Sequence, residues 1–131
     1  MFLRFASKKK VDERTGRPVG IFTAAYDLRD GETLSQVEED ELRELLGWFG
    51  KHLLIPSKFS RNRNGSHKNT PGISWIKDTA SEVIRELWCL KDFLERQGLA
   101  IDVIRTDRPG RIVYEDESQV IAEPFHQELI G

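Results

Sequence analysis

The 131-residue sequence has a single cysteine, Cys89, and no long hydrophobic run. One cysteine excludes an intramolecular disulfide and a zinc site built from the cysteines of one chain, which favours a reducing compartment. No apolar stretch approaches the ~20 residues that a membrane-spanning helix needs, and residues 1–7 are too short and too polar for the core of a signal peptide. We therefore expect a soluble, cytoplasmic protein in which Cys89 is a small buried hydrophobic residue.

The familiar cofactor motifs are also missing. No P-loop pattern is present, and no Gly-x-Gly-x-x-Gly follows a predicted strand. His52, His67 and His126 are too far apart for a recognised zinc spacing. We expect no cofactor and no metal site of this kind, and the position of His52 at the end of a predicted helix suits the helix dipole better than ligation.

Charge, which is plentiful, is distributed unevenly. The segment from Lys51 to Lys77 contains six Lys or Arg residues and no Asp or Glu, whereas the other 104 residues hold 14 bases and 22 acids. A second basic stretch runs from Lys8 to Arg17. Because the first segment is rich in Ser, Asn and Gly, we expect a mobile basic loop at about residues 56–72 within a single domain that covers residues 1–131. The two stretches give one positive face only if the fold brings them together; otherwise each is a solvated surface.

Hydrophobic periodicity predicts three helices. A short helix begins at about Gly20 and ends at Asp30. Ser35 and Glu38 form a capping box, which predicts a second helix from about residue 36 to residue 50 or a little beyond. An apolar stripe then predicts a long helix over about residues 74–97.

The strands are predicted at both ends of the chain. Residues 1–6 form one strand, residues 100–106 and 111–115 form a hairpin, and residues 120–122 extend this hairpin into a meander. Residues 8–18 have the composition of a loop. The predicted fold is α+β: a small three- or four-stranded, mostly antiparallel sheet packed against two longer helices and one short helix.

The basic loop is the first candidate site. Two arginines could fork onto phosphate oxygens, and two aromatic residues at the loop ends could stack on bases, although they could equally anchor these ends. No known nucleic-acid-binding motif is present, and the sequence pI is about 5.9. The residues predicted to contact a partner or phosphate are Lys51, Lys58, Phe59, Arg61, Arg63, Lys68, Trp75 and Lys77.

The acidic segment of residues 115–126 is the second candidate. Glu115 and Glu117 share one face if this segment is a strand, and Glu123 and His126 follow them. Carboxylates held together either bind a divalent metal or raise one another's pKa, which suits a hydrolase or nuclease. A charged turn would explain the same residues without any chemistry.

Three functions remain open from these patterns. The first is a small intracellular binding or regulatory module, not an enzyme, whose basic loop contacts a protein or a nucleic acid. The alternative is a small metal-dependent hydrolase or nuclease-like enzyme that uses the acidic segment. An oligomer subunit would be favoured instead if Trp48, Trp75 and Trp88 formed one exposed apolar patch. The sequence does not identify the partner or the oligomeric state.

Overall fold

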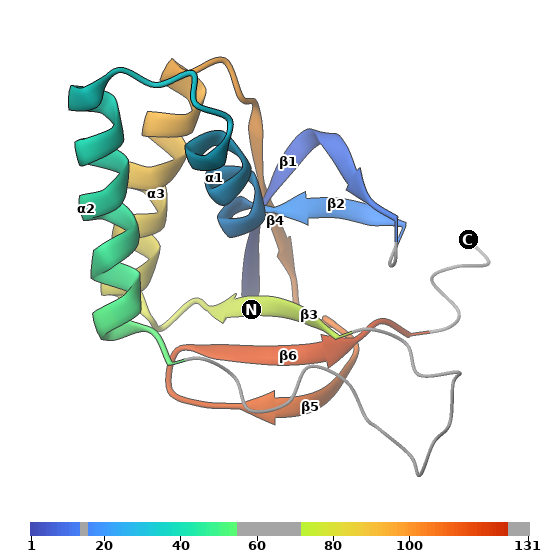
Figure 1. Ribbon diagram of the computed structural model, residues 1–131. Helices are drawn as coiled ribbons and strands as arrows, with labels where there is room; N and C mark the ends of the chain where they lie inside the picture. The colour runs from blue at the N-terminus through green and yellow to red at the C-terminus, as the bar shows by residue number, and fades with distance from the viewer. Residues whose placement is uncertain (14–15, 55–71, 126–131) are drawn as a thin grey trace, which may run out of the picture.

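A computed structural model describes residues 1–13, 16–54 and 72–125 of the chain (Figure 1). Among these residues, none of the helices combines the length and the hydrophobicity that spanning a lipid bilayer requires. The described elements follow one another as β1 (Phe2–Asp12), β2 (Arg17–Gly20), α1 (Ile21–Asp30), α2 (Gln36–His52), β3 (Ile73–Lys77), α3 (Ser81–Arg96), β4 (Ile101–Thr106), β5 (Arg111–Glu115) and β6 (Gln119–Glu123).

All six described strands belong to one antiparallel sheet in which β1 is the branch point. One edge of β1 pairs with β4 over residues 2–7. The other edge is shared, because β3 pairs with Phe2 and Leu3 whereas β2 pairs with residues from Ala6 to Asp12. The sheet continues from β3 to β6 and then to β5. It therefore forks on one side of β1, and β3, β6 and β5 run beneath the helices (Figure 1).

Arg4 fills the gap in this fork. Its guanidinium donates to the carbonyl oxygen of Pro18, at 2.8 Å, and to that of Ser74, at 3.4 Å. Burial and then the charge of Arg17 lower the pKa of Arg4 to about 10, while Asp12 acts in the opposite direction. Arg4 is still protonated at neutral pH, so it can hold the β2 and β3 branches together.

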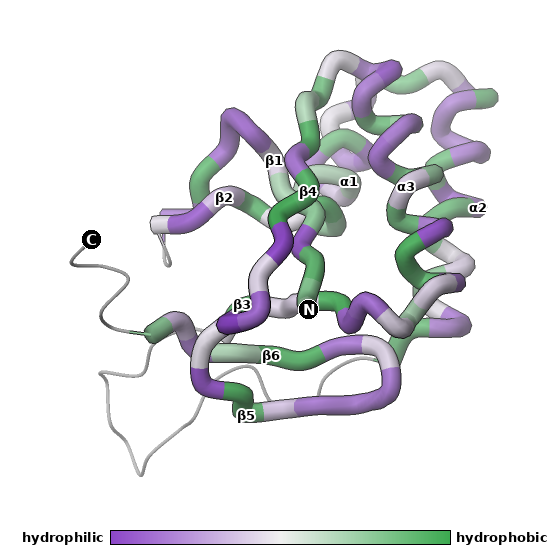
Figure 2. The backbone as a smooth tube through the Cα atoms, turned by 180° about the vertical axis from the view of Figure 1, so that it is seen from behind, coloured by the Kyte–Doolittle hydropathy of each residue, from purple (hydrophilic) through white to green (hydrophobic). Residues whose placement is uncertain are grey.

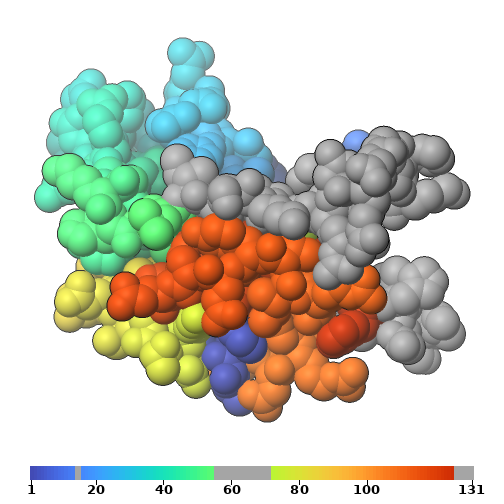
Figure 3. Space-filling view, turned by 90° about the horizontal axis from the view of Figure 1, so that it is seen from below, coloured from blue at the N-terminus to red at the C-terminus, as the bar shows by residue number. Residues whose placement is uncertain are grey.

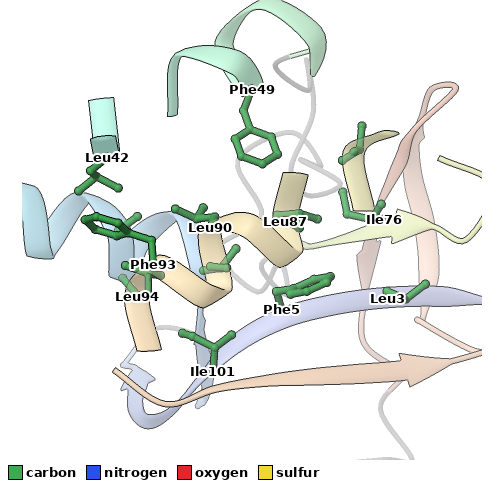
Figure 4. Close-up of a cluster of buried hydrophobic side chains, with 14 residues drawn as sticks. Leu3, Phe5, Leu42, Phe49, Ile76, Leu87, Leu90, Phe93, Leu94 and Ile101 are labelled. Atoms are coloured by element: carbon green, nitrogen blue, oxygen red, sulfur yellow. The ribbon is translucent and has the colours of Figure 1, made fainter. Parts of the chain in front are cut away.

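The helices form one layer on the sheet. Buried residues recur along α3 at helical spacing, and in Figure 2 hydrophobic and hydrophilic bands alternate along α2 and α3. The two helices run antiparallel, since Glu41 near the start of α2 contacts Arg96 at the end of α3. The core between helices and sheet is shown in Figure 4; its labelled residues are Leu3, Phe5, Leu42, Phe49, Ile76, Leu87, Leu90, Phe93, Leu94 and Ile101.

The predicted helices α1 and α2 are observed, and α3 is shorter than predicted. The capping box is present: the Ser35 hydroxyl accepts from the Glu38 amide at 3.2 Å, and the Glu38 carboxylate accepts from the Ser35 amide at 2.9 Å. However, residues 73–77 form β3, and α3 begins only at Ser81. The β-branched and aromatic residues of this segment pair with β1 and β6. This strand pairing determines their conformation, although their spacing also matches the apolar stripe of a helix.

The prediction of a three- or four-stranded sheet is wrong, because the described sheet has six strands. Residues 8–12 continue β1 and residues 17–20 form β2, where a loop was predicted. The predicted hairpin of residues 100–106 and 111–115 is also wrong: β4 pairs with β1, and β5 pairs with β6. The charged ends of β1 and β2 hid the strand pattern, and local turn composition does not reveal a pairing between distant strands.

Candidate functional site

An aromatic stack stands at the end of α2. The Trp48 and His52 rings are stacked 4.3 Å apart at an interplanar angle of 14°. Trp48 also meets the buried Phe49 edge to face, which fixes the stack to the core. His52 Nδ1 donates to the Trp48 carbonyl oxygen at 2.8 Å, because that oxygen can only accept. His52 Nε2 has no partner among the described residues and remains available to a ligand.

We call the stacked rings of Trp48 and His52 the Trp48–His52 platform. Two hollows adjoin this platform. The first, of about 460 Å³, lies between α2 and α3 and is lined by Glu41, Glu44, Leu45, Gly47, Trp48, Lys51, His52 and Glu86. The second, of about 480 Å³, is lined by Trp48, His52, residues 79–83 and residues 117–118. In Figure 3 the β5–β6 hairpin (orange) lies beside the end of α2 (green) and the residues before and at the start of α3 (yellow). Three separate segments thus meet at the platform.

The carboxylates of α2 and α3 fall into two groups. Six have partners: Glu38 binds Ser35 and Gln97, Glu39 and Asp40 bind Arg43, Glu41 and Asp92 bind Arg96, and Glu95 binds Lys91. Within the described residues, three have neither an ion pair nor a hydrogen bond, namely Glu44, Glu82 and Glu86. All three line the hollows, and Glu117 joins them from the β5–β6 turn.

Hydrogen bonds and charges stabilise the ionised forms of the paired group. The Ser35 amide and then the Gln97 side chain lower the pKa of Glu38. The Lys91 ammonium lowers the pKa of Glu95, and the Glu41 carboxylate raises the pKa of Arg96. Salt bridges and hydrogen bonds therefore satisfy six of these acids, including Glu41 at the first hollow, whereas Glu44, Glu82 and Glu86 have no such partner within the described residues.

The β5–β6 turn is built around Asp116. Its carboxylate accepts from the Tyr114 hydroxyl at 2.7 Å and from the amides of Ser118 and Gln119 at 2.9 and 3.0 Å. Burial alone would raise the pKa of Asp116, but these hydrogen bonds together lower it, and the same interaction raises the pKa of Tyr114. This turn holds Glu117 and Ser118 against the second hollow.

The acidic residues predicted as a catalytic group are not gathered at one point. Glu115 pairs with Lys77 at 2.5 Å and lies opposite Val120, whereas Glu123 lies opposite Arg111 at the other end of the hairpin. Val120, opposite Glu115, is three positions from Glu123 along β6, about 10 Å at ~3.3 Å per residue. No group of three or more His, Cys, Asp or Glu within the described residues could hold a metal ion. His126 lies outside those residues.

Gln119 fixes Leu54, the described residue that precedes the segment of residues 55–71. It is only 2% exposed, and its amide donates to the Leu54 carbonyl oxygen at 2.7 Å while accepting from the Ser74 hydroxyl at 3.2 Å. On the other side of the segment, Ile73 pairs with Ala122. Residues 54 and 73 are therefore both attached to β6. A lone Gln at the start of a strand gave no sequence signal for this role.

The predicted contact residues are placed as follows. Lys51 is exposed and lines the first hollow, while Lys77 is paired with Glu115. Trp75 is half-buried in β3, and its indole N–H is buried without a hydrogen-bond partner in the described part of the chain. Five further predicted residues lie outside the described residues: Lys58, Phe59, Arg61, Arg63 and Lys68.

The remaining basic and reactive residues gave mixed outcomes. In the N-terminal basic stretch, Lys8 pairs with Asp102 and Lys10 with Asp27, so part of its charge is neutralised. Cys89 is exposed, and the prediction that it is buried is wrong. It follows Trp88, which is 44% exposed although its ring meets the buried Phe5 edge to face. One position along a helix is enough to move a residue off the buried stripe.

Comparisons with known proteins give no relative from which a function could be transferred. No protein-family model matches the chain, and neither a curated protein nor a solved structure matches it. The function is therefore inferred from the platform, its hollows and the charges around them. The sequence did not predict this site, because His52 was assigned to the helix dipole and Trp48 was considered only as part of an apolar patch with Trp75 and Trp88. The only available signal was their spacing of four residues, which stacks side chains on one helix face.

Proposed function

We propose that this protein is a binding module whose contact surface is the Trp48–His52 platform with its two hollows. The observation that supports it best is an aromatic stack fixed to the core and flanked by hollows of about 460 and 480 Å³. Aromatic residues in a concave surface supply contact area at a low cost in conformational entropy, and a rim of polar groups supplies specificity.

Each unpaired polar group at the platform supports the same proposal. His52 Nε2 and the carboxylates of Glu44, Glu82 and Glu86 have no partners within the described chain, and all lie in one region. Protein ligands are favoured over nucleic acid at this surface, because phosphates would be repelled by the carboxylates around it. Contacts with nucleic acid through Lys51–Lys77 stay a prediction, which salt-dependent filter binding would test separately.

The metal-dependent hydrolase is the weaker reading of the described residues. Glu115 has a lysine partner, Asp116 is used in the turn, and Glu123 lies at the far end of the hairpin. A hydrolytic site needs its carboxylates within reach of one metal ion or one water. The described acids are instead distributed along the hairpin, as expected for residues that stabilise a turn.

A substitution that fills the first hollow tests the proposal. Gly47 lies in α2, lines this hollow, and has open space where a Cβ would lie. Gly47→Gln should therefore fold normally while obstructing the surface. Gly50→Gln is the matched control, because Gly50 also lies in α2 with open space around it but is absent from both hollows.

The measurement is quantitative capture of partner proteins from cells that make the protein. A specific partner should be retained equally by the wild type and by Gly50→Gln, and at least tenfold less by Gly47→Gln. Equal retention by all three would show that this surface is not the contact face. Metal-dependent cleavage of nucleic acid by the wild type, abolished in Glu115→Gln, would favour the hydrolase instead.

A further inference from the structure

The charge around the platform indicates what kind of partner it fits. Within the described residues, every carboxylate of α2 and α3 that lacks an ion pair or hydrogen bond lines one of the two hollows, namely Glu44, Glu82 and Glu86. Glu117 adds a fourth unpaired carboxylate from the β5–β6 turn. Lys51 is the single Lys or Arg among the residues that line them, and Glu41 is already paired with Arg96. The rim thus holds unpaired acids, whereas the other described carboxylates of α2 and α3 have partners.

Keeping these acids unpaired has a cost in the free protein. Glu82 and Glu86 are four residues apart on α3, and like charges at this spacing destabilise a helix. A cationic partner would remove that repulsion. We propose that the platform binds a basic, extended segment of a partner protein, with Lys or Arg side chains placed against these carboxylates; this inference rests on the binding function proposed above.

The spacing of the acids favours an extended basic chain over a single ion. Four residues of helix span ~6 Å, and side chains at alternate positions of an extended peptide recur every ~6.6 Å on one face. Bases at alternate positions can therefore follow Glu82 and Glu86 in turn. A single metal ion needs three or more ligands at one point, and the described residues provide no such group.

The direct test is titration of the 131-residue chain with a ten-residue peptide of alternating Arg and Ser, followed by calorimetry at low salt. The decisive variant replaces Glu44, Glu82, Glu86 and Glu117 by Gln. The matched control replaces four paired acids by their amides: Glu39→Gln, Asp40→Asn, Asp92→Asn and Glu95→Gln. Both variants change the net charge by four, so general attraction to a basic peptide is altered equally.

The proposal expects the rim variant to lose at least tenfold in affinity and the control to lose less than threefold. Lys51→Gln should bind severalfold more tightly, because it removes the one Lys at the rim. Gly47→Gln should weaken binding and Gly50→Gln should not. An equal loss in the rim variant and its control would overturn the proposal by showing that only net charge matters.

Two further results separate this inference from the binding function on which it rests. The wild type could fail to bind the peptide while still capturing a cellular partner that Gly47→Gln no longer captures. The platform would then bind a partner that is not basic, and only this inference would fail. If peptide affinity rises tenfold when Lys58, Arg61, Arg63 and Lys68 are replaced by Ser, the chain's own basic residues compete for the rim. That result would overturn the proposal of a basic segment from another protein.

Discussion

Where α2 begins and α3 ends, acids and bases from both helices are matched: Glu41 and Asp92 share Arg96, and the Gln97 side chain donates to Glu38. Where α2 ends and α3 begins, Glu82 and Glu86 have no such partners in the described chain, and an aromatic stack stands between two hollows. We call the first region the paired end and the second the platform end.

Under the proposed binding function, one end of this pair of helices contributes to stability and the other end to recognition. Partners within the chain satisfy the polar groups of the paired end, so a ligand could replace them only by breaking existing contacts. Glu44, Glu82 and Glu86 at the platform end have no partner within the described residues, so a ligand could contact them without breaking a described interaction. Both ends are attached to the same core, which includes Leu42 and Phe49 of α2 and Val83 and Phe93 of α3.

The largest effect on stability should come from a substitution in the core that the two ends share. Phe93 is fully buried, and the Arg96 guanidinium lies 5.4 Å from its ring centre. Phe93→Ala should lower the free energy of unfolding by ~3–5 kcal/mol through lost burial and a cavity. Denaturant melts would measure this loss. His52→Ala, on the exposed side of the platform end, should cost far less; comparable losses would mean that the platform is part of the core.

The next largest effect tests how the β5–β6 turn supports the platform end. Asp116→Ala removes the acceptor for Tyr114, Ser118 and Gln119, and should cost ~1–2 kcal/mol, since a partly exposed carboxylate contributes less than a buried one. The pKa of Asp116 is lowered in the folded state, so its contribution is fully present above the ordinary Asp pKa of ~3.9.

The pH dependence gives the sign of this contribution. As pH falls through the lowered pKa of Asp116, the carboxylate is protonated and its stabilising effect is lost. The stability difference between the wild type and Asp116→Ala should therefore shrink below pH ~4. A difference that is constant from pH 7 to pH 3 would show that the turn does not depend on the ionised form.

A smaller effect compares the two helix starts. Ser35 caps α2 with its side chain, whereas the N-cap of α3, Ala80, has no side-chain hydrogen bond. Ser35→Ala should cost ~1 kcal/mol, because one amide of the first turn loses its acceptor. Ser81→Ala at the platform end is the control and should be close to neutral. Chemical denaturation of both variants measures their free energies of unfolding. Equal losses of stability in the two variants would contradict the assignment of Ser35 as the cap.

These helix starts also show what the sequence could predict. The Ser35–Glu38 capping box is a local signal, because both partners lie within four residues, and it correctly predicted the start of α2. The start of α3 has no such signal, and the apolar residues of β3 fitted a helical stripe until their pairing with β6 was known. The pairing of β4 with β1 joins residues about 100 positions apart, which no local pattern records.

The candidate site was harder to predict for the same reason. Trp48 and His52 are neighbours on one helix, but Glu82 and Glu117 reach them only through tertiary packing. Charge alone pointed to the basic segment, where six Lys or Arg residues occur within residues 51–77 without any Asp or Glu. The acids of the platform end are scattered along the sequence, and in the sequence each resembles an ordinary surface residue. Only the structure shows that they lack partners among the described residues and lie close together.

The smallest predicted effect is the change in the free energy of unfolding when one Glu is replaced by Gln, and this change should have opposite signs at the two ends. Glu86→Gln removes the like-charge contact with Glu82, four residues before it, and should stabilise the protein by ~0.2–0.5 kcal/mol. Glu39→Gln removes the ion pair with Arg43, four residues after it, and should destabilise it by a similar amount. Gln and Glu have similar helix propensities, so the intrinsic helix term nearly cancels. Paired denaturant melts at low salt would resolve the signs, and both differences should diminish in 1 M salt as screening increases. If both substitutions destabilised the protein, the platform acids would be satisfied within the chain and would not be available to a partner.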